Sequence, residues 1–352
     1  MKKKRVMVWR WPLIILNILS SLGLLLAYSS SVIPPDIWWV PSLFGTATAY
    51  LLLLQLLWAI FWAFNSGILT AINLVFMASG FTLLADTFQW NYPEKNQNNS
   101  LRIVTANVGV FGYHPDTGMV ALNRLIKLNP DILCIQEFYE HPDTSLIQFI
   151  KNNSKLKYHA FVPIQKHYGL LTISKYPIMA SGLVDFKQTD LGTNGALYTD
   201  IKIKKQKIRI YNIHLASMRI QPHLKEIYQA GTHVMEEKED IISLLKKLRN
   251  SWKKQVLMVN KIKQHIGNRI DNIYLCGDFN STPYTYIQRE LASGFKDTFR
   301  EKGRGLGFTF RSNFPLIRID YIFVPKNKGV LRHETILFPE SDHFAVLAEV
   351  GN

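Results

Sequence analysis

Polar side chains with the functional groups of phosphate chemistry recur at the ends of short apolar runs in the later part of the chain. Six segments carry them, in the order Arg102–Asn107, Cys134–Glu137, Tyr211–Leu215, Gly277–Asn280, Arg318–Ile322 and Ser341–His343. Hydrolysis of a phosphate ester needs a positioned water, neutralised phosphoryl oxygens and help for the leaving oxygen. Carboxylate and amide oxygens suit Mg²⁺ or Mn²⁺, and histidine transfers protons near neutral pH. These residue types are therefore ones that metal-assisted hydrolysis of a phosphate ester could use.

Taken in this order, the six segments resemble the endonuclease/exonuclease/phosphatase superfamily, which has the deoxyribonuclease I-like fold. The matching features are an Asn and a Gln-Glu pair after strands, then Asn-x-His-Leu, Gly-Asp-Phe-Asn, Ile-Asp-Tyr-Ile and Ser-Asp-His. The resemblance covers roughly residues 100–352. It implies an α/β (α+β) fold, a four-layer α/β/β/α sandwich, with the active site along one edge of the two packed sheets.

The resemblance also implies a site for a divalent metal. Glu137, in the Gln-Glu motif, is the expected principal ligand, and Asn107 is expected to support the metal or the phosphate. Asp342, in the Ser-Asp-His motif, is a third candidate ligand. The expected cofactor is Mg²⁺ or Mn²⁺; Mg²⁺ keeps several waters and binds through one or two carboxylates.

Five further residues have the expected catalytic roles. Asp278 and Asn280 stand two positions apart, so an extended turn can point both at one pocket, where they would position water and phosphate. His343 would be the general base or would stabilise the phosphate, with Asp320 accepting a hydrogen bond that orients its ring. His214 would stabilise the charged phosphorane. Whether His343 or Asp278 activates the water stays open.

The resemblance adds three expected substrate contacts and one departure. Tyr168 opens a Gly-x-x-x-x-Ser-basic-x-Pro strand, Thr309 lies in a Gly-x-Thr-aromatic segment, and Arg219 either reaches phosphate or is solvated. Nucleases that act at abasic sites carry Asp where this chain has Gly109, and Tyr where it has His214. The chain is therefore more similar to the deoxyribonuclease, sphingomyelinase and inositol-phosphatase branches, which does not name a substrate.

Short β-rich runs and helical stretches alternate across the same region. Expected strands cover 101–108, 132–136, 169–174, 196–203, 208–215, 273–276, 318–324 and 345–350. Apolar spacing predicts helices over 119–128 and in the long insertion 225–266. Hairpin-like pairs predict largely antiparallel sheets. Cys134 and Cys276 lie in apolar runs, which predicts two buried strand residues and no zinc site or disulfide framework.

The first part of the chain is apolar. Residues 11–94 contain no Lys or Arg and only three acidic residues. Three stretches are long enough to cross a roughly 30 Å hydrocarbon core as helices, namely 11–32, 40–64 and 68–88. The sequence thus predicts a membrane anchor with about three transmembrane helices, a polar linker and a catalytic domain, over residues 1–92, 93–100 and 101–352 respectively.

The distribution of charge predicts the orientation of this anchor. The basic segment 2–10 is expected to stay in the cytoplasm, and the loop 34–39 has no positive charge. Three crossings place the catalytic domain outside the cytoplasm, in a multi-pass, bacterial-type protein of the inner (cytoplasmic) membrane. Two or four crossings would reverse this, and a cleaved signal peptide is the alternative to the first span. The near absence of ionisable residues in the spans favours an anchor over a transporter.

The region after the anchor is basic. Residues 95–352 hold 36 Lys and Arg against 23 Asp and Glu, a net charge of +13, and all ten His. Such a charge attracts polyanions or simply keeps the surface soluble. Seven of the basic residues cluster in the insertion, on a helix that touches anionic lipid or faces solvent: Lys246, Lys247, Arg249, Lys253, Lys254, Lys261 and Lys263.

The sequence therefore predicts an enzyme, a metal-dependent phosphoesterase tethered to a membrane. Its expected partners are a phosphate-ester substrate (nucleic acid, phospholipid or a phosphorylated small molecule) and membrane lipid, with no protein partner. A DNA endonuclease or exonuclease of the same fold is the alternative. A membrane-tethered binding protein whose catalytic residues have lapsed is the alternative of another class, and the complete set of catalytic residue types argues against it.

Overall fold

The computed structural model of the 352-residue chain describes residues 10–80, 85–92, 100–109, 114–186, 192–217, 234–268, 270–311 and 316–351. It divides into two compact units. The helical unit consists of residues 1–87 and 282–289, and the sandwich unit consists of residues 88–281 and 290–352. Most of the predicted linker 93–100 lies outside the described residues, as do Lys2 to Arg5.

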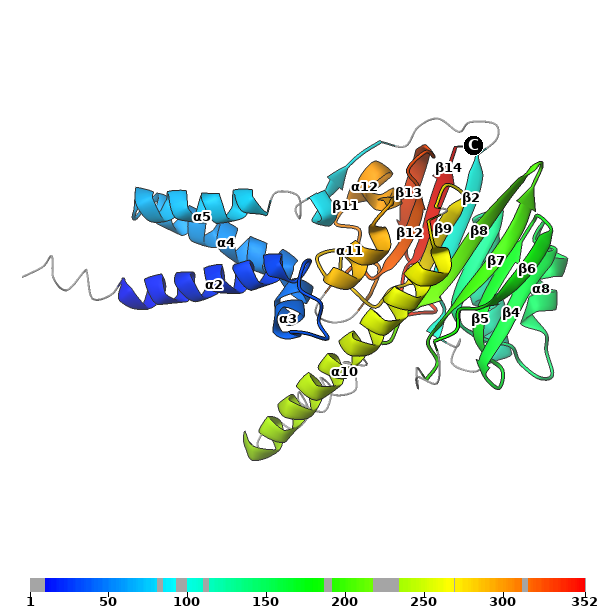
Figure 1. The fold of residues 1–352 in the computed structure, drawn as a ribbon, viewed down its shortest axis with the longest axis horizontal. Helices are drawn as coiled ribbons and strands as arrows, with labels where there is room; N and C mark the ends of the chain where they lie inside the picture. The colour runs from blue at the N-terminus through cyan, green and yellow to red at the C-terminus, as the bar shows by residue number, and fades with distance from the viewer. Residues whose placement is uncertain are drawn as a thin grey trace, which may run out of the picture. The chain divides into compact units, whose positions relative to one another are not determined.

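The described part of the helical unit includes the apolar helices α2 Trp11–Ser29, α3 Val40–Thr46, α4 Thr48–Ala63 and α5 Gly67–Ser79 (Figure 1). Among the described helices, α2 is long and apolar enough to cross a membrane. The pair α3 and α4 is a second candidate if the two form one bent span, and α5 is shorter. A signal sequence or a buried core helix has the same properties as α2, so the predicted count of three spans remains a prediction.

The helices are shorter than the predicted spans, for local reasons. The span expected over 40–64 is two helices that meet at Ala47 and are bent by 71°. There the hydroxyl of Thr48 donates to the carbonyl of Gly45 at 2.8 Å, an alternative partner that disfavours continuous helix. In the span expected over 68–88, the helix α5 ends at Ser79, with Gly80 at its C-cap.

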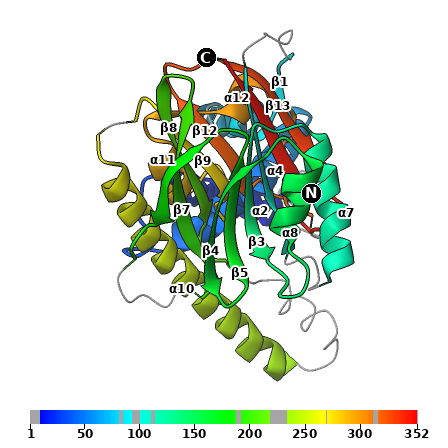
Figure 2. The same cartoon turned by 90° about the vertical axis from the view of Figure 1, so that its right-hand side faces the viewer.

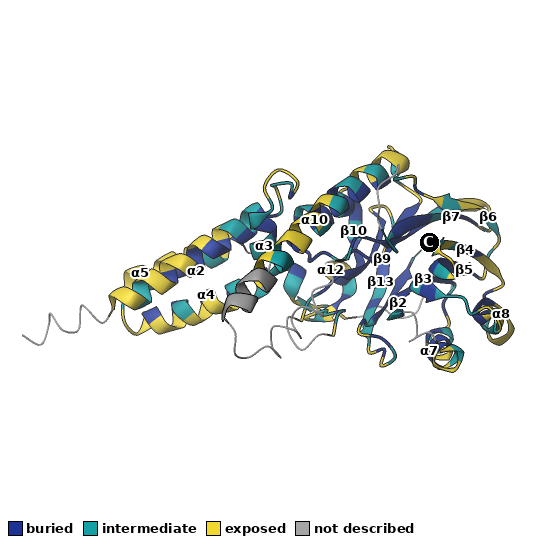
Figure 3. Cartoon of the chain, turned by 90° about the horizontal axis from the view of Figure 1, so that it is seen from below, coloured by how far each residue is buried: buried dark blue, intermediate teal, exposed yellow. Residues whose placement is uncertain are grey.

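The helical unit buries polar side chains beside an apolar cluster of Leu24, Ala27 and Leu52, and Figure 3 shows its buried and exposed faces. Asn17 of α2 and Asn73 of α5 exchange two hydrogen bonds, of 2.9 and 3.1 Å. Gln55 of α4 joins them and also donates to Ser21 of α2 at 3.0 Å. Large apolar side chains are exposed on the same helices, including Ile15, Leu16, Leu19, Leu22, Leu53, Leu57, Ile60, Ile68 and Val75. A water-soluble bundle would turn most of these apolar side chains inward.

The sandwich unit is built on two six-stranded sheets. The first sheet has the order β13-β14-β2-β3-β5-β4 and the second the order β10-β12-β9-β8-β7-β6. The strands of the first are β2 Leu101–Asn107, β3 Ile132–Tyr139, β4 Tyr158–Gln165, β5 Tyr168–Ser174, β13 Val330–Ile336 and β14 Ala345–Val350. Those of the second are β6 Ile178–Leu183, β7 Gly195–Ile203, β8 Gln206–His214, β9 Ile273–Asp278, β10 Phe295–Asp297 and β12 Asp320–Pro325. A small separate sheet pairs β1 Gln89–Trp90 with β11 Arg304–Gly305.

The sheets are largely antiparallel, as predicted. Among the described strands, β2 with β3 and β8 with β9 are the parallel pairs. Apolar side chains from both sheets meet in one buried cluster that includes Ile103, Ile210 and Ile322. Cys134 and Cys276 belong to this cluster as buried, free thiols, which confirms that both are buried strand residues.

Helices cover the outer face of each sheet (Figures 1 and 2). On the first sheet, α7 Pro115–Lys127 and α8 Leu146–Asn153 pack through Leu125 and Ile150 against Leu133 and Ile135. On the second sheet, α10 Val234–Ile266 brings His265 within 2.7 Å of the hydroxyl of Tyr211. The short helix α12 Thr298–Lys302 follows. The short helix α11 Tyr286–Ala292 lies partly in the helical unit, which includes residues 282–289. The sandwich unit is therefore the predicted four-layer α/β/β/α fold.

Candidate active site

The predicted polar residues lie at the ends of the strands that the two parallel pairs bring together. Asn107 ends β2, and its pair partner in β3 is Gln136, directly before Glu137. His214 ends β8 opposite Asp278, which ends β9. Because strands of a parallel pair finish at the same edge, each sheet presents its polar residues at one edge.

Asp278 joins the two sheets at this edge. Its Oδ2 accepts a hydrogen bond from Asn107 Nδ2 at 3.0 Å, although Asn107 belongs to the other sheet. Asn280 adds two bonds, from its main-chain nitrogen at 2.8 Å and from Nδ2 at 3.1 Å. Asp278 Oδ2 lies 3.6 Å from His214 Nε2 and 3.8 Å from His343 Nε2. Asp278 is thus a buried carboxylate held by N–H donors at the centre of the site.

A glycine allows β9 to deliver Asp278 to this position. Gly277 has φ +136°, and a Cβ there would stand 2.0 Å from the carbonyl oxygen of Ile213 in β8. Only glycine permits so close an approach of two main chains. Gly277 belongs to the Gly-Asp-Phe-Asn segment, so the motif has a backbone requirement as well as a chemical one.

Glu137 is aimed by a bulge in β3. The register between β3 and β5 shifts between Ile135 and Phe138, and Glu137 has φ +55°. A bulge of this kind re-aims one side chain away from the regular alternation. The carboxylate is 27% exposed and lies 3.6 Å from His214 Nε2. Among the described residues it accepts one long hydrogen bond, from Asn107 at 3.4 Å, so its oxygens have room for a further ligand.

Asp320 and His343 form the contact that the sequence predicted. His343 Nδ1 lies 3.0 and 3.2 Å from the two carboxylate oxygens of Asp320, and both side chains are buried. Burial alone lowers the pKa of His343, but the carboxylates of Asp320 and Asp278 outweigh it and raise that pKa. The main-chain nitrogen of Asp320 donates to the hydroxyl of Thr309 at 3.0 Å. The imidazole is therefore fixed in orientation, with Nε2 turned toward Asp278.

His214 is buried without a hydrogen bond. Its exposed fraction is 1%, and neither ring nitrogen has a hydrogen-bond partner in the part of the chain that the structure describes. An unsatisfied buried polar group costs about 1–3 kcal/mol. Because Glu137 and Asp278 flank its Nε2 at 3.6 Å, this nitrogen is available to a ligand in the site.

The remaining predicted residues occupy other positions. Asp342 is half exposed, and its carboxylate lies 4.0 Å from His343 Nε2, at the margin of the cluster. Thr309 is buried, and its hydroxyl accepts from the nitrogens of Ile319 and Asp320, so it supports Asp320. Tyr168 pairs with Tyr139, two residues beyond Glu137. Arg219 lies outside the described residues.

Two residues near the site were not singled out from the sequence. Ser341 donates to the carbonyl of Asn107 at 2.8 Å and accepts from the nitrogen of His343 at 3.1 Å, which ties β2 to the His343 loop. Gln255 of α10 donates to the carbonyls of Ala216 and Asn280 at 2.8 and 3.0 Å. Ser341 stands in the Ser-Asp-His motif and could have been found there, whereas no local signal marks Gln255.

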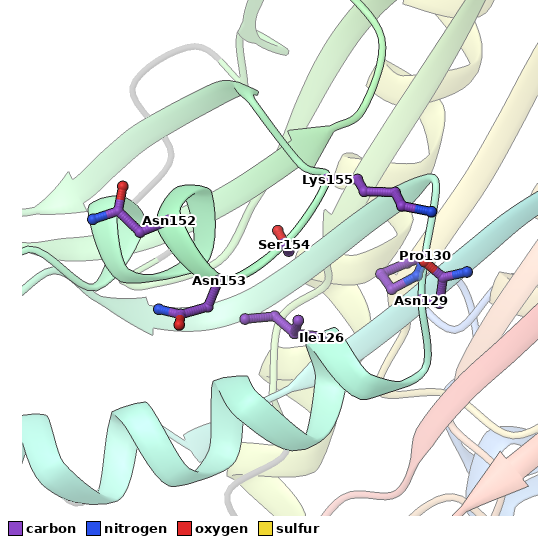
Figure 4. A pocket seen from close by; sticks show the side chains of 7 residues that line it. All are labelled: Ile126, Asn129, Pro130, Asn152, Asn153, Ser154 and Lys155. Carbon is purple, nitrogen blue, oxygen red and sulfur yellow. The ribbon is translucent and has the colours of Figure 1, made fainter.

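A surface pocket of about 390 Å³ lies elsewhere, between the ends of α7 and α8 (Figure 4). Asn129 and Pro130 line it directly before β3 begins, together with Ser154 and Lys155. Glu137 lies near the other end of β3. The pocket is therefore separate from the polar cluster.

The donor set fits a divalent cation. Asp278, Asp320 and His343 offer ligand atoms within 4.8 Å of one another, and the carboxylate of Glu137 adds a partly free oxygen donor beside Asp278. In the first group, the imidazole of His343 is a nitrogen donor and is hydrogen-bonded to Asp320. Oxygen donors are preferred by Mg²⁺ and Mn²⁺, so Glu137, Asn107 and Asp278 suit these ions better.

Residues 104–343 match the family model described as the endonuclease/exonuclease/phosphatase family. The chain belongs to this family. All six polar segments of this family member fall in or overlap the matched range. Residues 10–87 match a second family model, described as a domain of unknown function, DUF8431. A comparison with curated proteins found no significant match.

Solved structures share the fold of this family member at low sequence identity. A functionally unknown conserved protein from Enterococcus faecalis is 18% identical, with a TM-score of 0.51 over 72% of this chain and 100% of that chain. An endonuclease/exonuclease/phosphatase from Beutenbergia cavernae is 16% identical, with the same TM-score over 72% of each chain. D. rerio TDP2, complexed with single strand DNA product, is 15% identical, with a TM-score of 0.51 over 72% of this chain and 100% of that chain. These likenesses establish the sandwich fold.

Proposed function

We propose that the chain is a divalent-metal-dependent phosphoesterase held at a membrane by its helical unit. The observation that supports the activity most strongly is the meeting of six polar residues from both sheets at one edge, namely Asn107, Glu137, His214, Asp278, Asp320 and His343. A lapsed site would be expected to have lost a carboxylate or an imidazole from this set.

Glu137 and Asn107 are the proposed metal ligands, with Asp278 beside them. When bound, the metal would neutralise charge on the phosphoryl oxygens and on the leaving oxygen. Asp342, half exposed at the margin, is a weaker proposal as a ligand.

The remaining residues bind and orient the phosphate and the water. Asp278, held by N–H donors from Asn107 and Asn280, presents a fixed negative charge toward the water. His214 offers a ring N–H to a phosphoryl oxygen, since neither of its nitrogens is bonded to another described residue. His343 holds one proton at Nδ1 against Asp320 and has Nε2 for proton transfer or for the phosphate.

The attachment to a membrane is supported by the helical unit. Its amide side chains Asn17, Gln55 and Asn73 bond one another inside the bundle, while leucine and isoleucine side chains cover the outside. Polar side chains bond across helices in this way when lipid surrounds them. We propose three crossings, with the sandwich unit on the extracytoplasmic side of the inner membrane, because the segment before α2 is basic.

A substrate panel on the full chain in detergent tests the activity. Hydrolysis of bis-p-nitrophenyl phosphate should require Mg²⁺ or Mn²⁺ and stop with EDTA. The same preparation is then offered plasmid DNA, sphingomyelin and inositol phosphates, which separate a nuclease from a lipid or sugar phosphatase. Asp278→Asn should abolish hydrolysis of every substrate, whereas Asp200→Asn, an equally buried carboxylate paired with Arg209, should not. Metal-independent or absent hydrolysis of the whole panel would contradict the proposal.

DNA is the alternative substrate. The sandwich unit shares its fold with D. rerio TDP2, which has been solved with a single strand DNA product, and residues 95–352 have a net charge of +13. Binding of nucleic acid weakens steeply as salt rises. A nuclease would therefore cleave plasmid DNA in preference to the other substrates, with a strong dependence on salt.

A further inference from the structure

The chain contributes to the helical unit twice. Residues 1–87 belong to it, and residues 282–289, here called the returning segment, belong to it again between two parts of the sandwich unit. The returning segment begins two residues after Asn280, the last residue of the Gly-Asp-Phe-Asn motif. A tether needs only the first of these connections. The second joins the helical unit directly to the loop that carries Asp278 and Asn280.

Ser30, at the C-cap of α2, binds the returning segment within the helical unit. Its hydroxyl lies 2.7 Å from the carbonyl oxygen of Tyr284 and 2.7 Å from that of Ala27 in its own helix, so it can donate to either. The carbonyl of Ser30 accepts from the main-chain nitrogen of Tyr286 at 2.8 Å. Ser30 and Tyr284 are both buried. Two buried hydrogen bonds therefore connect the end of α2 to the returning segment.

Gly45 of α3 allows the same parts of the helical unit to pack closely. A Cβ at Gly45 would stand 2.7 Å from the Cβ of Ser30 and 3.6 Å from the methyl group of Thr285. The hydroxyl of Thr282 donates to the carbonyl of Gly45 at 3.4 Å. Thr282 and Thr285 are both 1% exposed. The end of α2, the glycine of α3 and the returning segment thus form one buried contact.

The sandwich unit binds the chain directly before the returning segment. The hydroxyl of Tyr321 donates to the carbonyl of Ser281 at 2.8 Å, and Gln255 donates to that of Asn280 at 3.0 Å. Asn280 has φ +45°, a left-handed conformation that is uncommon for residues other than glycine. Such a conformation persists where the surrounding structure fixes it. The contacts on both sides of the loop therefore determine where Asp278 and Asn280 point.

We propose that the helical unit positions the active-site loop Asp278–Asn280 through the returning segment, with Ser30 and Gly45 as positioning residues. This rests on the proposed phosphoesterase activity, in which the loop orients water and phosphate. A misplacement of about 1 Å can cost about a hundredfold in rate. A fraction of that displacement, after the segment is loosened, should cost on the order of tenfold.

Amide hydrogen exchange and turnover of the full chain in detergent provide the test. Ser30→Ala should speed exchange in the returning segment about three- to tenfold, the equivalent of one buried hydrogen bond. Exchange at residues 278–281 should rise with it. The kcat for bis-p-nitrophenyl phosphate, normalised to the folded fraction, should fall about tenfold. Gly45→Ala, whose new methyl group would collide with Ser30, should have the same effects by a different route.

Two matched variants of the helical unit are the controls. Ser29→Ala removes the neighbouring hydroxyl, which donates to Leu26 within α2. Gly67→Ala adds a Cβ that would have no described neighbour within 4 Å. Both should keep normal exchange at residues 278–289 and normal kcat. Exchange in β3, which carries Glu137 on the other sheet, should stay normal in all four variants, because the loop alone is displaced.

The positioning role would be overturned by normal exchange of the returning segment in both Ser30→Ala and Gly45→Ala. Faster exchange there with normal exchange at residues 278–281 and normal kcat would overturn it too, since the contact would then not reach the loop. Equal losses in the control variants, or faster exchange in β3, would show a general loss of stability instead. Exchange needs no turnover, so a chain that hydrolyses nothing in the substrate panel would contradict the proposed function, while exchange at residues 278–281 would still decide the coupling.

Discussion

The hydrogen bond between Asp320 and His343 allows a sharp test of the proposed site. The perturbations are Asp320→Asn, which removes the charge that faces Nδ1 at 3.0 Å, His343→Ala, and the two together. If Asp320 acts only by orienting His343 and stabilising its protonated form, the carboxylate has no effect on activity once the imidazole is removed. The double variant should then be little worse than His343→Ala alone, because residues that act as a unit are not additive.

The expected size follows from the geometry. A positioned acid or base contributes roughly 10²–10⁴-fold to rate, which is about 3–5 kcal/mol at about 1.4 kcal/mol for each factor of ten. Because both side chains are buried and bonded, each single variant should lose a comparable factor. The coupling free energy of a complete unit should equal the smaller of the two losses.

Turnover of bis-p-nitrophenyl phosphate at saturating Mg²⁺ measures these factors, normalised to the folded fraction. This correction matters, because breaking a buried pair costs roughly 3–5 kcal/mol of stability. Asp200→Asn provides the control for such a loss on the same sheet. Full multiplication of the two single losses in the double variant would refute the reasoning and give Asp320 a role independent of His343.

Three further outcomes are expected. Glu137→Gln should reduce turnover by orders of magnitude and weaken Mg²⁺ affinity. The control Glu140→Gln, which changes the residue directly after β3, should do neither. Near-normal turnover of Glu137→Gln would show that Glu137 does not belong to the site. Alkaline phosphatase fused after Asn352 should be active and a cytoplasm-dependent reporter inactive; the opposite result would show an even number of crossings. Burial lowers the pKa of His333 to about 4, so only the unfolded state binds its proton as pH falls from about 6.5 to about 4. The midpoint of thermal unfolding should fall over that range by the equivalent of up to about 3 kcal/mol, and His333→Gln should flatten the dependence.

The strands that the sequence predicted best are those buried on both faces. Ile273–Asp278 and Ala345–Val350 are mostly apolar and are buried at every position. By contrast, β4 and β13 were missed. Tyr158–Gln165 contains a proline and is largely exposed, because it lies at one edge of its sheet. Val330–Ile336, at the other edge, has four polar residues in a row, Arg332 to Thr335. Tertiary pairing with an inner strand, which no local pattern reveals, makes these segments strands.

Helix boundaries were missed where the first turn is polar. The predicted helix 119–128 begins at Pro115, since proline is well tolerated at the first position of a helix. In the site, the order of motifs led to Asp320 and His343, and their contact is present. The motifs could not lead to Gln255, because no recognisable motif marks this residue of α10, although its side chain donates to the carbonyl of Asn280. The roles of the site residues remain proposals that the variants above test.

The hydrogen bond between Asn107 and Asp278 joins residues 171 positions apart. Each residue ends a strand, and the two strands belong to different sheets. Loop closure over such a separation must precede the contact, and chains rich in distant contacts fold slowly. Neither sheet alone contains all the residues of the site. The site therefore forms only when the two sheets pack against each other. A refolding chain would therefore regain the proposed metal binding and turnover together in its slowest phase, after most of its secondary structure had returned.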